Sequence, residues 1–222
     1  MKGKAGSVFR IAEENPWIPG CTLSGEISGG SAHAAVFSLA PGTQISPENY
    51  PEPKLWLLLE GRLRLVGASD PDEPAGGRFV EKGELYVVPA GCPVGVRTDA
   101  GCVYLELQFR EDAVMNEMVK GGSVFKLADL VPYQDGKIVS MDVVDQENAH
   151  FALMSFDAGT GLSEHAAPGD ALVFALDGEG IISYEGKEYR IKAGENFKFD
   201  KNGMHAVRAE GRFKMALLLV SE

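Results

Sequence analysis

Short apolar segments recur along the whole chain, and glycine, proline or asparagine separates each segment from the next. "ENFKFD" and "KEYRIK" alternate between apolar and polar residues, which indicates strands with one buried and one solvated face. "ALLLV" is apolar throughout, which indicates a strand covered on both faces. No long segment carries helical periodicity. The pattern therefore predicts an all-β chain, built as a sandwich or a small barrel.

The chain contains an internal repeat. "GSVFRIA" from Gly6 recurs as "GSVFKLA" from Gly122, and "LWLLLEGRL" from Leu55 matches "LVFALDGEG" from Leu172. Two copies of a unit of roughly 100 residues have the size of two small domains. We therefore expect an N-terminal domain over residues 1–110 and a C-terminal domain over residues 122–222. The segment 111–121 between them is rich in Ala, Met, Glu and Lys, which predicts a short helical linker.

Charge and cysteine content exclude several classes of partner. The formal net charge is −11, so phosphate backbones and anionic membrane surfaces are repelled, and we expect neither nucleic acid nor membrane as a partner. Three cysteines without a C-x-x-C pair give little support to a disulfide framework or a thiolate zinc site. The start of the chain has no apolar core of a signal peptide. We therefore expect a cytoplasmic protein.

The spacing of glycines and histidines in the second half resembles the cupin superfamily. Its first motif reads G-x5-H-x-H-x3-4-E-x6-G and its second reads G-x5-P-x-G-x2-H-x3-N. The matching residues of the second half are Gly159, His165, Gly178, Gly194 and His205. Ala167 and Ala171 occupy the other two ligand positions.

The first half fits the same frame without the metal ligands. Its matching residues are Gly42, Gly61, Gly83, Pro89 and Gly91, and its four ligand positions hold Glu48, Tyr50, Lys54 and Val94. The resemblance implies a bicupin, that is, two tandem double-stranded β-helix (jelly-roll) barrels. Gly61 and Gly178 each follow an apolar strand, where we expect a tight turn with positive φ.

The resemblance makes His165 and His205 candidate ligands of a divalent metal (Zn, Fe, Ni or Mn) in the C-terminal barrel. If the strand is regular, His165, Ala167 and Ala171 share one face, so His165 points into the barrel. Two imidazoles are fewer than a tight metal site needs. His150 and Asp170 are additional candidates, although Asp170 has the opposite parity. The alternatives are a pair of buried, hydrogen-bonded histidines, or a metal-free site for a small anion or carbonyl.

In the N-terminal barrel, Glu48, Tyr50 and Lys54 also share parity and are candidate ligand-binding residues. Facing inward, Lys54 places a positive charge near the position of the family's metal, with Glu48 as its counter-ion. The alternative is that "SPENYPEPK" loops outside the barrel and leaves all three in solvent, because proline interrupts strand pairing.

Three functions are compatible with such a chain, and its residues leave catalysis open. The first is binding of a small-molecule ligand in the C-terminal barrel. The second, which the resemblance allows, is a metal-dependent dioxygenase, lyase or isomerase acting on a small polar substrate. The third is a non-catalytic structural or assembly protein. Association into a homo-oligomer is compatible with all three.

Overall fold

The structure is a computed structural model that describes residues 1, 3–67 and 77–221. Strands account for nearly all of its regular structure, and the helical elements among these residues are α1 (Ile11–Glu14) and a 3-10 turn (Leu127–Asp129). The all-β prediction is confirmed. No helix in the described part of the chain is both long and apolar enough to cross a membrane.

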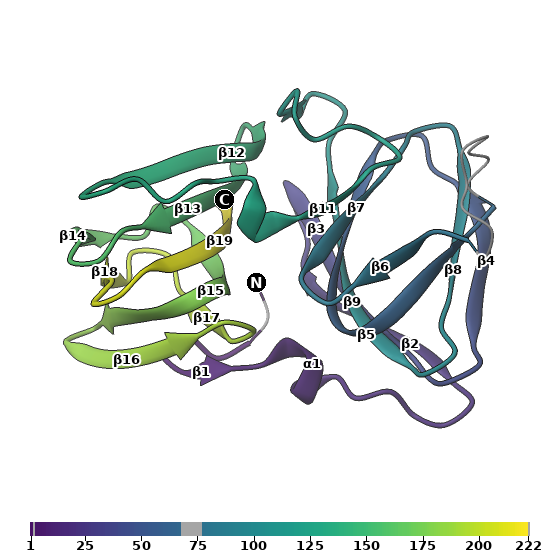
Figure 1. The fold of residues 1–222 in the computed structure, drawn as a ribbon, viewed down its shortest axis with the longest axis horizontal. Coiled ribbons are helices and arrows are strands. Elements are labelled where there is room, and N and C mark those ends of the chain that lie inside the picture. The colour runs from purple at the N-terminus through teal and green to yellow at the C-terminus, as the bar shows by residue number, and fades with distance from the viewer. Residues whose placement is uncertain (2, 68–76, 222) are drawn as a thin grey trace. The chain divides into compact units, whose positions relative to one another are not determined.

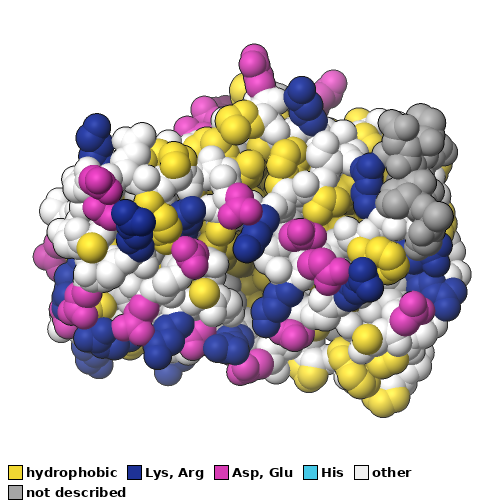
Figure 2. All heavy atoms as spheres, viewed as in Figure 1, with side chains coloured by type: hydrophobic (Ala, Val, Ile, Leu, Met, Phe, Trp, Pro, Cys, Tyr) yellow, Lys and Arg dark blue, Asp and Glu magenta, His cyan; other side chains and the backbone are white. Residues whose placement is uncertain are grey.

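The described chain forms two compact units (Figure 1). The N-terminal unit comprises residues 12–111 and 117–126, and the C-terminal unit comprises residues 1–11, 112–116 and 127–222. On the face drawn in Figure 2, acidic and basic side chains are interspersed. The negative charge of the sequence is therefore not gathered into one patch on this face.

The N-terminal unit is a nine-stranded antiparallel sheet with the order β11-β7-β5-β9-β3-β2, to which β4, β6 and β8 are added. Its long strand β5 pairs with β7 and β9 along its first part and with β6 and β8 along its second part. The strands are β2 (Thr22–Ser28), β3 (Ala32–Leu39), β4 (Gln44–Asn49), β5 (Lys54–Val66), β6 (Phe79–Glu81), β7 (Glu84–Val88), β8 (Pro93–Arg97), β9 (Cys102–Phe109) and β11 (Val124–Lys126).

The C-terminal unit repeats this arrangement in a ten-stranded sheet. Its order is β1-β17-β15-β19-β13-β12-β10, and its long strand β15 pairs first with β17 and β19 and then with β16 and β18. The strands are β1 (Val8–Phe9), β10 (Val114–Met115), β12 (Ile138–Gln146), β13 (Ala149–Phe156), β14 (Gly161–Ala166), β15 (Asp170–Tyr184), β16 (Lys187–Lys192), β17 (Asn196–Phe199), β18 (Met204–Arg208) and β19 (Phe213–Val220).

The repeated "GSVF" segments are exchanged between the units. Strand β1, from the start of the chain, pairs with β17 of the C-terminal unit, whereas β11 pairs with β7 of the N-terminal unit. The compact units therefore differ from the expected domains 1–110 and 122–222 in these two segments.

The expected helical linker at 111–121 is not found. Val114 and Met115 instead form β10, which pairs with Asp145 and Val144 of β12, and turns surround it. A helix of so few residues is marginal by itself, so strand pairing outweighs the helical propensity of the segment.

The tight turns expected at Gly61 and Gly178 are also absent. Both glycines have positive φ (81° and 70°), but they lie inside the long strands β5 and β15. A Cβ atom at either position would collide with the carbonyl oxygen of Gly101 or Arg212, respectively. Glycine is therefore required where the long strand passes close to its neighbour.

Candidate functional site

The two predicted histidines lie side by side in the C-terminal unit. His165 of β14 and His205 of β18 are register partners, and their ring centroids are 4.2 Å apart. Nδ1–H of His165 donates to the Ser163 carbonyl at 2.8 Å, and Nδ1–H of His205 donates to the Gly203 carbonyl at 3.1 Å. Each ring therefore keeps Nε2 as its remaining polar atom.

The two rings differ in burial. His205 is only 7% exposed, whereas His165 is exposed, because a register shift between Leu162 and His165 interrupts the regular strand. The inward orientation expected for His165 assumed a regular strand, and this assumption was wrong. Burial lowers the pKa of His205 below its usual value of 6.5, and the neighbouring His165 lowers it further.

The interior beside His205 is filled by aromatic side chains. The Phe199 ring stacks on His205 with centroids 4.1 Å apart, and Phe197 and Phe213 are fully buried in the same core. Ala167 and Ala171, at the remaining ligand positions of the motif, are also buried in this core.

The donor set around the two histidines does not fit a tight divalent-metal site. Such sites normally have three or more protein ligands. Within residues 1, 3–67 and 77–221, no group of three or more His, Cys, Asp or Glu side chains could hold a metal ion. The pair supplies two imidazoles, and neighbouring alanines have no donor atom.

The two additional candidates of this unit are engaged in other interactions. Asp170 contacts the N-terminal ammonium of Met1 at 2.9 Å and the Lys198 ammonium at 3.6 Å. His150 is paired with Asp145 at 2.6 Å across β12 and β13, with both side chains exposed. Neither residue therefore completes a ligand set with His165 and His205.

In the N-terminal unit, the polar candidates line a cavity of about 140 Å³. Lys54, the first residue of β5, is only 8% exposed, and its Nζ lies 2.8 Å from Oε1 of Glu106, which is 5% exposed. Trp56 Nε1–H donates to Oε2 of the same carboxylate at 2.8 Å. Lys54 and Trp56 face the same way because side chains alternate along a strand, and Glu106 of β9 is the register partner of Trp56.

Tyr50 and Glu48 lie at the exposed side of this cluster. The Lys54 ammonium sits 3.8 Å from the centre of the Tyr50 ring, and the Tyr50 hydroxyl donates to Glu48 Oε2 at 3.0 Å. Burial raises the pKa of Tyr50, and the Glu48 carboxylate raises it further. Glu48 itself is exposed and follows a register shift in β4 like the one before His165. The expected convergence therefore occurs for Lys54 and Tyr50, but the close counter-ion of Lys54 is Glu106 and not Glu48.

The sequence reasoning missed Glu106. The residue lies in "CVYLELQF", where a single carboxylate interrupts an otherwise mostly apolar strand. A charged residue in such a strand signals a buried charge that needs a partner. Trp56 and Tyr104, which also line the cavity, carry no sequence motif that distinguishes them from ordinary core aromatics.

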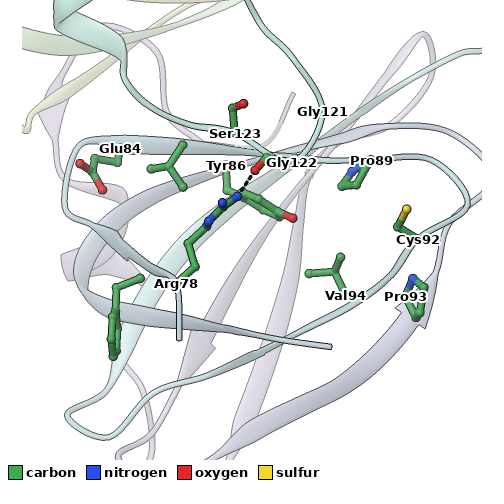
Figure 3. Close-up of a pocket in the computed structure, with 12 residues that line it drawn as sticks. Arg78, Glu84, Tyr86, Pro89, Cys92, Pro93, Val94, Gly121, Gly122 and Ser123 are labelled. Atoms are coloured by element: carbon green, nitrogen blue, oxygen red, sulfur yellow. Dashed lines mark hydrogen bonds between the residues drawn. The ribbon is translucent and has the colours of Figure 1, made fainter. Parts of the chain in front are cut away.

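The N-terminal unit has a second hollow of about 810 Å³ (Figure 3). Arg78 points across it toward Gly122 and donates to the Gly122 carbonyl, while Cys92 and Val94 stand on the other side. Glu84, also on its wall, accepts the Glu81 backbone N–H at 2.8 Å. This hollow is more open than the cavity at Lys54, so it is the weaker candidate for a selective site.

Comparisons with known proteins are in line with this architecture. Residues 152–221 match the cupin domain family. The chain is similar to a solved structure of a cupin 2 conserved barrel domain protein from Leptotrichia buccalis, with a TM-score of 0.84, 28% identity and 99% of each chain covered. No curated protein matches.

More distant likenesses concern the fold alone. A variant of salicylate 1,2-dioxygenase from Pseudoaminobacter salicylatoxidans has a TM-score of 0.59 at 13% identity, covering 87% of this chain and 73% of that chain. A variant of oxalate decarboxylase from Bacillus subtilis has a TM-score of 0.53 at 11% identity, covering 100% of this chain and 78% of that chain.

Proposed function

Because this chain belongs to the cupin superfamily, we propose that it is a small-molecule-binding bicupin whose ligand site is the cavity at Lys54. Two tandem jelly-roll barrels are supported by the common strand order of the two units and by a relative that covers 99% of the chain. The observation that carries the proposed site is the buried Lys54–Glu106 pair on the wall of a cavity of about 140 Å³.

The fold itself does not require this polar pair. Lys54 pairs with Val88 in the N-terminal unit, and the equivalent pair in the C-terminal unit is Ala171 with Phe199. The position of Glu106 is taken by Leu217 in the C-terminal unit. The same scaffold therefore closes with apolar side chains at the same register positions. Burying two charges costs free energy that an apolar pair avoids, which favours a functional reason for keeping them.

The same comparison shows a second difference between the two interiors. Phe199 fills the interior of the C-terminal unit beside His205, whereas the smaller Val88 stands at the equivalent position next to Lys54. The His165–His205 pair, which the sequence favoured as the site, has the Phe199 ring stacked on the face of His205. A metal-dependent reaction at that pair is not proposed, because its donor set is incomplete.

The proposal is tested by fluorescence. The chain has two tryptophans, so Trp17→Phe leaves Trp56, on the cavity wall, as the reporter. We expect saturable quenching or enhancement of Trp56 emission by members of a library of ring-sized fragments. Val96→Phe fills the cavity and should abolish this response, whereas His205→Val in the other unit should leave it intact.

Two results would overturn the proposal. One is a response that survives Val96→Phe and disappears with His205→Val, because it moves the site to the C-terminal unit. The other is the lack of a saturable response to any fragment. Circular dichroism and thermal unfolding establish that each variant is folded before titration, and Val96→Ile is the milder replacement if Val96→Phe does not fold.

A further inference from the structure

We propose that the cavity at Lys54 selects an uncharged, ring-sized molecule with a hydrogen-bond acceptor, and that the Tyr104 hydroxyl donates to this acceptor. This inference rests on the proposed ligand site and names the chemical class that the site takes. The inference rests on the size of the cavity, on the pairing of its charged side chains and on the Tyr104 hydroxyl, which has no protein acceptor in the described part of the chain.

The size and walls of the cavity suit a single ring. Its volume of about 140 Å³ is close to that of an engineered cavity of about 150 Å³ that binds benzene. Phe37 and Tyr104 form one wall as stacked rings 5.0 Å apart, and Trp56 packs against Tyr104 at 5.7 Å. Ile45 and Val96 add aliphatic surface. Such walls stabilise an apolar body through buried area.

The charged groups of the cavity already have partners. The Lys54 ammonium contacts Glu106 and the face of Tyr50, the second oxygen of Glu106 accepts from Trp56, and Glu48 accepts from Tyr50. A bound anion would therefore meet two carboxylates against one ammonium. A bound cation would compete with Lys54 for Glu106 and for the Tyr50 ring, and the remaining carboxylate, Glu48, is exposed, so that water screens its attraction. Both charged classes are disfavoured in an interior where charges are poorly screened.

Tyr104 supplies the polar contact. The residue is only 2% exposed and lines the cavity, and its hydroxyl has no hydrogen-bond partner among the described residues. No fully enclosed polar side-chain atom in this part of the chain lacks a partner, so the Tyr104 oxygen must be open to the cavity. Burial raises the pKa of Tyr104, and Glu106 raises it further, so the phenol is protonated and donates. A hydroxyl that is open to the cavity and has no partner within the described structure is available to donate to an acceptor on a ligand.

The test compares three probes of nearly equal shape and different charge. Benzamide is neutral, benzoate is an anion and benzamidinium is a cation. In the Trp17→Phe background we expect benzamide to bind at least about tenfold more tightly than either charged probe. Toluene, which lacks an acceptor, should bind about fivefold more weakly than benzamide. Tyr104→Phe should weaken benzamide by a similar factor, leave toluene unchanged and so remove the discrimination.

The outcomes separate this inference from the proposed site. Tighter binding of benzoate or benzamidinium that Val96→Phe abolishes refutes the neutral class and supports the site. Benzamide binding that Tyr104→Phe does not change refutes the role of the hydroxyl. Failure of every probe, toluene included, counts against the site itself. The charge series uses the native cavity residues, so it decides the class even if Tyr104→Phe does not fold.

Discussion

At the scale of single residues, the Lys54–Glu106 pair distinguishes the N-terminal unit. The parity of Lys54 matches the ligand positions of the motif, but the prolines around it left open whether it faces inward or into solvent; the structure places it on the cavity wall. The sequence did not indicate the counter-ion, because Glu106 lies 52 positions further along the chain, and the register of β5 on β9 brings the two together. The face of a strand on which a side chain lies can be predicted from that strand's sequence alone. Its partner on a neighbouring strand depends on the register between segments that are distant in sequence.

We predict that Lys54→Met destabilises the folded chain by about 3 kcal/mol, because it leaves the buried Glu106 carboxylate without its cation. Adding Glu106→Gln should restore more than half of the loss, since the amide keeps an acceptor for Trp56 and carries no charge. Urea unfolding at neutral pH measures both changes. Lys82→Met is the matched control: its partner Glu60 lies 2.5 Å away and both side chains are about half exposed, so the expected cost is under about 1 kcal/mol. Equal costs for the two lysines would contradict the prediction.

A second prediction at this scale concerns pH and His205. Its pKa is lowered in the folded chain, so between that value and 6.5 the unfolded chain binds more protons. The free energy of unfolding should therefore fall as the pH decreases through 6.5. His205→Val, which introduces the residue found at the equivalent Val94, should reduce this fall between about pH 7.5 and 5.5.

Denaturant unfolding at several pH values provides the measurement for His205. The control is His33→Val on β3, where the histidine is exposed, and we expect it to leave the pH dependence as it is. An unchanged slope in His205→Val would show that the neutral form of this ring is not what the folded state requires.

At the scale of elements, the strands could be predicted and their irregularities could not. Alternation and turn residues gave the all-β fold, and the glycine spacings gave the superfamily. The register shifts before Glu48 and His165 are invisible to a parity argument, and both residues are exposed, although Glu48 still lines the cavity and the His165 ring still lies beside His205. The short linker was predicted as a helix from propensity alone, and pairing with β12 overrode it.

The equivalent strands β8 and β18 allow a prediction that compares the same substitution in the two units. Val96 of β8 and Val207 at the equivalent place in β18 are both buried in the cores of their units, but Val96 also lines the cavity. Val96→Phe should cost under about 1 kcal/mol because it enters open space, and Val207→Phe should cost about 1–3 kcal/mol because it overpacks a filled core. Thermal unfolding compares the two variants. A larger cost for Val96→Phe would mean that the cavity walls cannot accommodate a ring.

At the scale of the whole molecule, the repeat was readable from the sequence but the exchange of its first segment was not. "GSVFRIA" and "GSVFKLA" are nearly identical in sequence. Each unit has an equivalent strand with which such a segment can pair: β7 in the N-terminal unit and β17 in the C-terminal unit. Local preference therefore cannot tell which strand a given copy joins.

The exchange predicts that the chain tolerates a cut between Asn116 and Glu117. Fragments 1–116 and 117–222 should co-purify when they are expressed together, because each carries a segment of the other fragment's compact unit. Affinity capture through a tag on one fragment measures the association. Val8→Asp with Phe125→Asp should reduce the yield of the partner fragment, while Ile18→Asp, at an exposed position outside the strands, should not. Equal loss of association with Ile18→Asp would contradict the role of the exchanged strands.

The pairing of β1 with β17 also bears on how the protein is made. Val8 and Phe9 leave the ribosome early, yet their partners Phe197 and Asn196 are translated near the end. The N-terminal unit has all of its strands once Lys126 has emerged, so it can fold during synthesis. Strand β1 therefore cannot pair until β17 has been made, and the C-terminal unit completes its sheet only after β19 has followed.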